Sequence, residues 1–161
     1  MKKIFIALLS TVFLFAACNS SDNDGPNSAD DAVTIEEGEI VAMDEAEFKS
    51  IIDGDAEKIW AASAFTLAGL TTFTDCRLDD SMLFRSDGTY EYNGGQDLCG
   101  AEDDAFIKTG TWEVNFDDAT IIFDKGTSNE EVGEVIGMTE TEIKLKGAYM
   151  MMEVRGVYTS D

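Results

Sequence analysis

Acidic side chains are the most numerous groups in this sequence that could do chemistry. Three adjacent pairs occur, Asp79-Asp80, Asp103-Asp104 and Asp117-Asp118. A glycoside hydrolase needs two carboxyl groups placed across a sugar from each other. Adjacent residues on a strand point to opposite faces of the sheet, and adjacent acids in a turn both face water. The pairs therefore predict solvated turns, and we expect no catalytic residues and no enzyme activity.

The same acids also raise the question of metal binding. Two segments, 22–25 and 53–57, begin like oxygen-ligand loops for calcium. Neither has the glycine at the sixth position and the bidentate glutamate at the twelfth that an EF-hand requires. The sequence contains no histidine, which excludes Ser-His-Asp sites, Cys-His sites and every His-ligated metal site. We expect neither a metal nor a cofactor, and we interpret the two segments as a linker and a helix end.

The amino terminus has the layout of an export signal. A short positive end, Met1-Lys2-Lys3, precedes an almost wholly apolar run from Ile4 to Ala17, which is too short to span a bilayer comfortably as a helix. The next residue is Cys18, and Leu14-Phe15-Ala16-Ala17-Cys18 resembles the lipobox of bacterial lipoproteins. That resemblance implies a signal peptide over residues 1–17 and a lipid on Cys18. The alternative is an ordinary signal peptide followed by an incidental cysteine.

A lipid on Cys18 would anchor the chain to the cell envelope. Each buried methylene contributes roughly 0.8 kcal/mol, and stable attachment takes more than one acyl chain; a diacylglyceryl group with an added N-acyl chain such as palmitate meets that condition. Residues 20–24, Ser-Ser-Asp-Asn-Asp, resemble the acidic tether of surface-exported lipoproteins, although any solvated linker would carry such acids. We expect an anchor and acidic tether over residues 18–42 and a location at the outer membrane, exposed at the cell surface.

Charge limits the partners of this chain. The net charge is −22 over 161 residues, and removing Lys2 and Lys3 with the signal would take it to −24. Such a surface repels phosphate backbones, which excludes nucleic-acid binding. It also repels anionic lipid headgroups, so we expect membrane contact through the anchor alone. The residues beyond the signal suffice for one domain with a core.

The two remaining cysteines, Cys76 and Cys99, form an even pair in an exported chain. In an oxidising location such a pair indicates a disulfide, worth about 3 kcal/mol in the chain-entropy account. A reactive thiol is the alternative, and it would need a basic environment. Arg77 is adjacent, but acidic residues surround the pair in the sequence. We favour the structural disulfide.

The periodicity of apolar residues predicts one helix followed by a meander of strands. A helix is expected at about 44–53, with Asp44 as its N-cap and Gly54 as its end. From Trp60 onward the period changes to two, with Asp-Gly and Asp-Asp turns. Eight strands are enough to close a small antiparallel barrel. They are expected at 59–67, 81–86, 89–94, 108–116, 119–124, 131–138, 141–147 and 149–158. Whether 33–42 forms a further strand is left open.

Several stretches, in this order, resemble the lipocalin-like domain of Bacteroidetes-type bacterial lipoproteins. The resemblance runs from about Asp53 to the end of the chain, and residues 43–161 are taken as the domain. It implies a small eight-stranded antiparallel barrel with a cysteine pair matching Cys76 and Cys99, and it implies no reaction. The stretches are DGDAEKIW at 53–60, CRLDDSMLFRSDGTY at 76–90, Cys99, GTWEV at 110–114 and TETEIKL at 139–145.

The interior of this barrel is the candidate binding site. Its candidate lining residues share the inward phase of their strands: Met82, Phe84, Tyr90, Tyr92, Trp112, Val114, Met150 and Met152. An eight-stranded barrel is either filled by such side chains or holds one small ligand. A ligand here would be chiefly apolar, oriented by the hydroxyl of Tyr90 or Tyr92.

Two functions follow from the two states of the interior. The first is a non-catalytic envelope lipoprotein that binds a small apolar ligand inside the barrel. The alternative is a packed module whose loops or acidic surface contact another envelope protein or a glycan. Replacing Met152 by Glu is expected to reduce affinity in a binding barrel and to reduce stability in a packed one, because an unpaired buried charge is costly.

Overall fold

The computed structural model describes residues 34–71, 75–97, 99 and 107–161. One helix, one short 3-10 helix and eight strands follow each other along this part of the chain. They are α1 (Glu45–Asp53), β1 (Glu57–Leu67), η1 (Asp75–Arg77), β2 (Ser81–Arg85), β3 (Thr89–Asn93), β4 (Ile107–Asn115), β5 (Thr120–Phe123), β6 (Glu131–Met138), β7 (Glu142–Tyr149) and β8 (Met152–Thr159).

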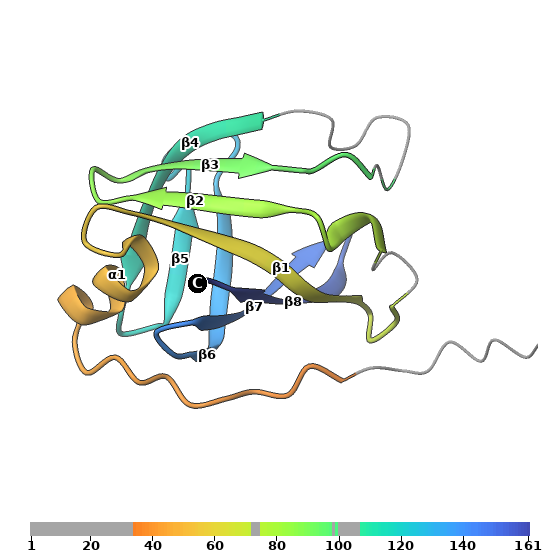
Figure 1. Ribbon diagram of the computed structural model, residues 1–161, viewed down its shortest axis with the longest axis horizontal. Coiled ribbons are helices and arrows are strands. Elements are labelled where there is room, and N and C mark those ends of the chain that lie inside the picture. The colour runs from red at the N-terminus through yellow and green to blue at the C-terminus, as the bar shows by residue number, and fades with distance from the viewer. Residues whose placement is uncertain (1–33, 72–74, 98, 100–106) are drawn as a thin grey trace, which may run out of the picture.

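The strands form one closed barrel in which each strand pairs with its sequence neighbours and β8 returns to pair with β1 (Figure 1). Every pairing is antiparallel. Closure satisfies the backbone groups of both outer strands, so the sheet has no free edge. The predicted fold class, an eight-stranded antiparallel barrel with one short helix, is confirmed.

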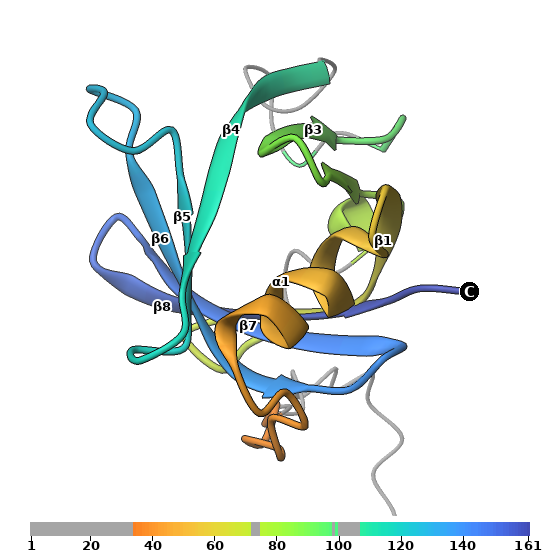
Figure 2. The same cartoon turned by 90° about the vertical axis from the view of Figure 1, so that its left-hand side faces the viewer.

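Helix α1 lies across one end of the barrel (Figure 2). The Asp44 carboxylate accepts a hydrogen bond from the Glu47 backbone N–H at 2.9 Å, as its predicted role as N-cap requires. At the other end Gly54 is left-handed and donates its N–H to the Ser50 carbonyl at 2.8 Å. Phe48 and Ile52 are fully buried on the face that α1 presents to the strands. The helix therefore closes this end, which we call the α1 end.

The largest fully buried side chains of the core gather at the α1 end. Trp60 is fully buried, and its indole N–H donates to the Ile52 carbonyl at 2.8 Å, which attaches the helix to β1. The rings of Phe84 and Trp112 meet edge to face with centroids 5.0 Å apart, an arrangement that stabilises aromatic pairs beyond their burial. This half of the barrel is filled by side chains.

Residues 34–42 lie outside the barrel and pass along its lower side in Figure 1. Their one ladder contact is an isolated parallel bridge between Ile40 and Met138. Gly38 donates its N–H to the Ile136 carbonyl at 2.7 Å, and Arg155 Nη1 donates to the Ile35 carbonyl at the same distance. The question left open by the sequence is thus answered for 34–42, because the segment packs on the barrel without forming a regular strand.

The end of the barrel opposite α1 carries the β1–β2, β3–β4, β5–β6 and β7–β8 connections. We call it the open end, because α1, the only α-helix of the described residues, lies at the other end. Within the described residues, no helix has the length and apolar character needed to cross a bilayer.

Candidate functional site

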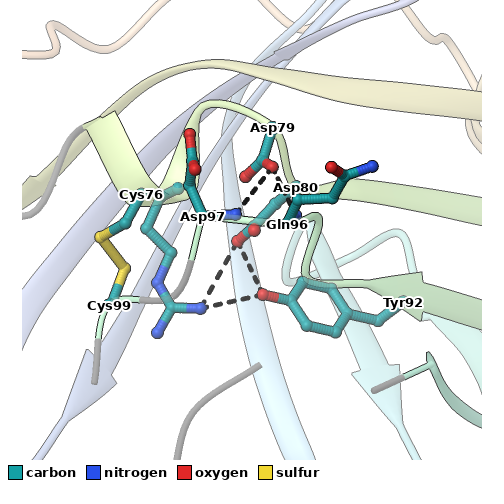
Figure 3. Close-up of a disulfide and its surroundings, with 8 residues drawn as sticks. Cys76, Asp79, Asp80, Tyr92, Gln96, Asp97 and Cys99 are labelled. Carbon is teal, nitrogen blue, oxygen red and sulfur yellow. Dashed lines mark hydrogen bonds and ion pairs between the residues drawn. A yellow bond between two sulfur atoms is a disulfide. The ribbon is translucent and has the colours of Figure 1, made fainter. Parts of the chain in front are cut away.

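A disulfide joins two connections of the open end. Cys76 in η1 and Cys99 after β3 are bonded, with their sulfur atoms 1.98 Å apart (Figure 3). The predicted disulfide is confirmed. Because these cysteines belong to the β1–β2 and β3–β4 connections, the bond holds one side of the barrel mouth together.

Asp79 reinforces the same junction without a covalent bond. Its carboxylate accepts hydrogen bonds from the backbone N–H groups of Gln96 at 2.6 Å and Asp97 at 3.1 Å (Figure 3). These bonds hold the pKa of the Asp79 carboxyl below its ordinary value. Gly95 is required here, because a Cβ at that position would lie 2.2 Å from the Asp79 carboxyl carbon.

Asp80, the next residue, points the other way and is buried. The residue is only 5% exposed to solvent. Its Oδ2 atom accepts hydrogen bonds from the Tyr92 hydroxyl at 2.6 Å and from Arg77 Nη1 at 3.5 Å (Figure 3). Arg77 Nη1 also donates to the Tyr92 hydroxyl at 3.0 Å, which closes a three-membered polar cluster.

The second carboxylate oxygen of Asp80 is the unusual feature of this cluster. In the described structure Oδ1 is buried and has no hydrogen-bond partner. Burial raises the pKa of the Asp80 carboxyl above its ordinary value, although Tyr92 and Arg77 act in the opposite direction. A buried polar atom without a partner is costly. Oδ1 therefore lacks the hydrogen-bond partner that a buried carboxylate oxygen ordinarily has.

Tyr158 on β8 lies near the polar cluster, close enough for the Asp80 carboxylate to affect its hydroxyl. The register places it opposite Ala62 on β1 and Ile143 on β7. Its ring lies over Gly156, where a Cβ would come 2.7 Å from a ring carbon. Burial and the neighbouring Asp80 carboxylate raise the pKa of the Tyr158 hydroxyl to about 12, so the group is a neutral hydroxyl at physiological pH.

A second polar contact lies further round the wall. The Tyr90 hydroxyl donates to Asp124 Oδ2 at 3.1 Å, and Lys108 Nζ lies 4.0 Å from the same oxygen. Burial and the Asp124 carboxylate raise the pKa of the Tyr90 hydroxyl. Gly110 makes room for both partners, because a Cβ there would lie 2.0 Å from Asp124 Oδ1.

Six of the eight predicted lining residues do lie together inside the barrel. Met82, Phe84, Tyr90 and Trp112 are buried members of the core, and Tyr92 and Val114 pack against it. Most of them fill the interior. The hydroxyls predicted to orient a ligand, those of Tyr90 and Tyr92, already bond to Asp124 and Asp80.

The prediction was wrong for Met150 and Met152. Tyr149 and Met152 are the closing pair of the β7–β8 hairpin, so Met150 and Met151 form its turn. Met150 is 74% exposed and Met152 is 39% exposed. Met152 does have the inward phase of β8, as predicted. However, it is the first residue of the strand, at the rim of the open end, and its side chain is partly exposed.

The prediction for the adjacent aspartate pairs was also correct in part and wrong in part. Asp117 and Asp118 are exposed in the β4–β5 turn, as predicted, and Asp103-Asp104 lies outside the described residues. The expectation that Asp79 and Asp80 both face water was wrong for Asp80. Alternation offered a signal that would have found it, because Asp80 has the same phase as Met82 and Phe84, two residues and four residues further along.

The segment at 53–57 is a helix end, as the sequence suggested. Asp53 is buried and its carboxylate accepts from Lys49 Nζ at 2.6 Å and from the Asp55 N–H at 2.9 Å. Among the residues that the structure describes, no three acidic or sulfur side chains gather in a way that would hold a metal. The segment at 22–25 lies outside the described residues.

A hollow of about 490 Å³ lies on the outer surface near the α1 end. Its lining is mixed, with Ile59 and Leu83 beside Glu57 and Asp161. It also includes Ser160, whose hydroxyl is buried without a partner. An unpaired buried hydroxyl costs less free energy than an unpaired buried carboxylate. The charged groups that converge on one another, Arg77 and Asp80, lie inside the barrel. The hollow is therefore the weaker candidate for a binding site.

Comparison with known proteins assigns the chain to a family. The profile of the lipocalin-like domain matches residues 47–145, from α1 to the middle of β7. No curated protein matches the chain. The family match covers more than half of the sequence and coincides with the closed barrel described above. This protein belongs to the lipocalin-like domain family.

Proposed function

We propose that this protein is a non-catalytic, lipid-anchored envelope protein that binds a small molecule in the open half of its barrel. The observation that carries the proposal is Asp80 Oδ1, a buried carboxylate oxygen inside the barrel without a hydrogen-bond partner. A lipocalin-like barrel suits a small ligand, because eight strands enclose an interior of about that size.

The interior changes character from one end to the other. At the α1 end aromatic side chains fill it. Toward the open end, inward-facing positions of the wall are held by glycine. Gly133 pairs with the buried Ile121, and Gly147 pairs with Val154. A Cβ at either position would meet its nearest neighbour at an ordinary contact distance, 3.8 Å or 3.5 Å. The wall therefore carries no side chain into the interior at these two positions.

The polar cluster defines the chemistry of the ligand. An unpaired buried oxygen costs about 1–3 kcal/mol, which a donor on the ligand would recover. A hydroxyl or an amine can donate to Asp80 Oδ1, and an apolar body can lie against the aromatic floor formed by Phe84 and Trp112. The ligand class is thus an apolar molecule with a hydrogen-bond-donating head. This is more polar than the ligand expected from the sequence.

The disulfide and the amino-terminal sequence support the assignment to the envelope. The disulfide between Cys76 and Cys99 suits an oxidising compartment. The chain before Thr34 carries the lipobox-like segment ending at Cys18. Acylated Cys18 would hold the barrel at the membrane surface, at the outer membrane and on the outside of the cell. A mass spectrum of the protein from its native membrane tests this part, because acylation adds the mass of the lipid to a chain that begins at Cys18.

Native mass spectrometry tests the ligand. The protein is purified gently, weighed as a folded species and weighed again after denaturation. We expect an extra mass that is lost on unfolding. Asp80→Asn should weaken binding of a donor-headed ligand about tenfold or more, equivalent to 1.4 kcal/mol or more. Asp117→Asn, an exposed turn acid, should not change it. Equal affinity in both variants would contradict the proposed anchor point.

The packed α1 half favours one alternative, a module that contacts an envelope protein or a glycan through its surface. That function predicts a clean mass with no ligand and no binding from a panel of fatty acids, sterols and amines. It also predicts that Asp80→Asn has no effect on partner binding, since Asp80 is buried.

A further inference from the structure

Two neighbouring turns at the open end carry exposed apolar side chains. Leu67 and Leu70 close one turn through reciprocal backbone hydrogen bonds, and Tyr149 and Met152 close the other. The Ala68 N–H donates to the Glu153 carbonyl at 2.7 Å, so the two turns lie side by side. The exposed apolar residues on them, which we call the apolar tip, are Leu70, Tyr149, Met150, Met151 and Met152.

Two methionines of the apolar tip have a left-handed backbone conformation, which is unfavourable for a residue with a side chain. Met150 has φ 48° and Met151 has φ 67°. A two-residue hairpin turn with positive φ at both positions is of type I′, which favours Asn-Gly. Methionine holds both positions instead, and Met151 is 100% exposed. Strained backbone together with exposed apolar side chains indicates a site of interaction.

We propose that the apolar tip inserts into the surface of a lipid bilayer. A projecting turn with unbranched, flexible methionine side chains can enter the disordered boundary between headgroups and acyl chains. Tyr149 beside them has the amphipathic ring that prefers this boundary. The inference rests on the lipid anchor at Cys18 proposed above.

The described part of the chain begins on the same side of the barrel as the apolar tip (Figure 1). Residues 38–41 run parallel to the last residues of β6, a strand that begins at the open end with Glu131. The chain therefore enters the described structure from the open end and runs toward α1 (Figure 1). From Cys18 to Val33 it can reach about 55 Å at most. A lipid at Cys18 thus keeps the tip at a high effective concentration near the bilayer.

Charge determines which bilayer is suitable. The net charge of −22 repels anionic headgroups, so the tip is expected to enter a zwitterionic surface. Beside the tip, Glu153 pairs with Arg155 at 2.8 Å, which reduces repulsion there. Membrane contact through the anchor alone, as expected from the sequence, is extended by this second contact.

Fluorescence quenching on vesicles tests the proposal. The chain from Cys18 to Asp161, which contains every described element, is coupled through the Cys18 thiol to maleimide lipid in phosphatidylcholine vesicles with brominated acyl chains. Cys76 and Cys99 are bonded to each other, so they do not compete for the maleimide. Tyr149→Trp places a fluorophore in the tip, and Ile59→Trp places one at an exposed position of β1 near the α1 end. Trp60 and Trp112 are buried and give a constant background.

We expect severalfold stronger quenching of the Tyr149→Trp chain than of the Ile59→Trp chain. Adding Met150→Asn and Met151→Gly to Tyr149→Trp should reduce the quenching to the level of Ile59→Trp in a chain that remains folded by circular dichroism. Anionic lipid at low salt should also reduce it. Quenching that is equal in the two tryptophan chains, that survives the Asn-Gly change, or that grows on anionic vesicles would overturn the proposal. Absence of quenching would overturn it and point to a protein partner.

The chemical coupling separates this test from the proposed function. If the protein from its native membrane carries no acyl group, the anchor proposal fails, while the vesicle result still reports on the tip. If the tip is not quenched on vesicles to which the chain is coupled, the docking proposal fails and acylation at Cys18 is unaffected.

Discussion

The turn at Met150 and Met151 gives the sharpest prediction for stability. Both residues have positive φ, which costs a residue with a side chain because its Cβ approaches the following carbonyl oxygen. Neither side chain is buried, so their replacement removes no core contact. The double change Met150→Asn, Met151→Gly puts at these positions the pair that a type I′ turn favours. We expect a more stable protein.

The expected gain follows from the two dihedral angles. A left-handed residue other than glycine costs about 1–2 kcal/mol, and asparagine and glycine avoid most of that cost. Glycine gives back about 0.5–1 kcal/mol through the greater freedom of the unfolded chain. Relief at both positions, about 2–4 kcal/mol at most, less the loss at glycine, leaves a net gain of about 1–3 kcal/mol. Since the entropy of unfolding is roughly 0.3 kcal/mol/K for a domain of this length, the melting temperature should rise by about 3–10 °C.

Calorimetry and urea unfolding measure this gain, with the m-value as a check that the unfolded state is unchanged. A matched control introduces the same Asn-Gly pair at Asp117 and Asp118, an exposed two-residue stretch whose φ values are not positive. The control should not gain stability, and it loses the contact between Asn115 and Asp118. If the tip variant melts no higher than the unchanged protein, the left-handed backbone of Met150 and Met151 is not the source of strain inferred here.

Three further predictions concern the interior and the mouth. Replacing Cys76 and Cys99 by Ser should lower the free energy of unfolding by about 3 kcal/mol, as measured in urea; an equal midpoint with and without reductant in the unchanged protein would contradict this. The raised pKa of Asp80 means that the folded state holds its proton more tightly than the unfolded chain. Its contribution to stability therefore falls as pH rises from the ordinary aspartate value of 3.8 through the folded pKa. The difference in stability between Asp80→Asn and the unchanged protein should accordingly grow in favour of the variant over that window, and a constant difference would contradict a raised pKa. Met82→Glu should destabilise by several kcal/mol, whereas Met152→Glu at the rim should change stability by about 0.5 kcal/mol or less. Equal losses for both would mean that the rim position of Met152 is wrong.

Much of the fold was readable from the sequence because closure of a small antiparallel barrel depends on local features. Alternation with period two and the turn residues between runs located every strand to within a few residues. The helix was bounded by Asp44 and Gly54, whose capping bonds depend only on neighbouring residues. These signals do not depend on long-range packing, so a single sequence is sufficient to reveal them.

The candidate site was harder to predict from the sequence. Its residues lie at strand ends, where the alternation of inward and outward side chains no longer determines burial. Asp80 has the inward phase of β2 but precedes its first paired residue, and an aspartate beside another aspartate suggests a solvated turn. Met152 also has an inward phase, but the hairpin closes at Tyr149 and Met152, so the phase no longer implies burial. Residues 34–42 lack periodicity, and only the tertiary structure shows that they pack on β6.

The two ends of the barrel depend on each other. At the α1 end, Trp60, Phe84 and Phe48 are almost completely buried, and each contributes roughly 1.5–3 kcal/mol by leaving water. The open end carries features that oppose folding, namely the unpaired Asp80 oxygen and the left-handed methionines. The disulfide and the hydrogen bonds that Asp79 accepts hold the β1–β2 and β3–β4 connections of this end together. Removing the disulfide should therefore disorder the polar cluster before the aromatic floor. Amide hydrogen exchange would show this as faster exchange in β2 and β3 near Asp80 and Tyr92, with β1 near Trp60 unchanged; uniform acceleration of exchange would show that the barrel opens as one unit.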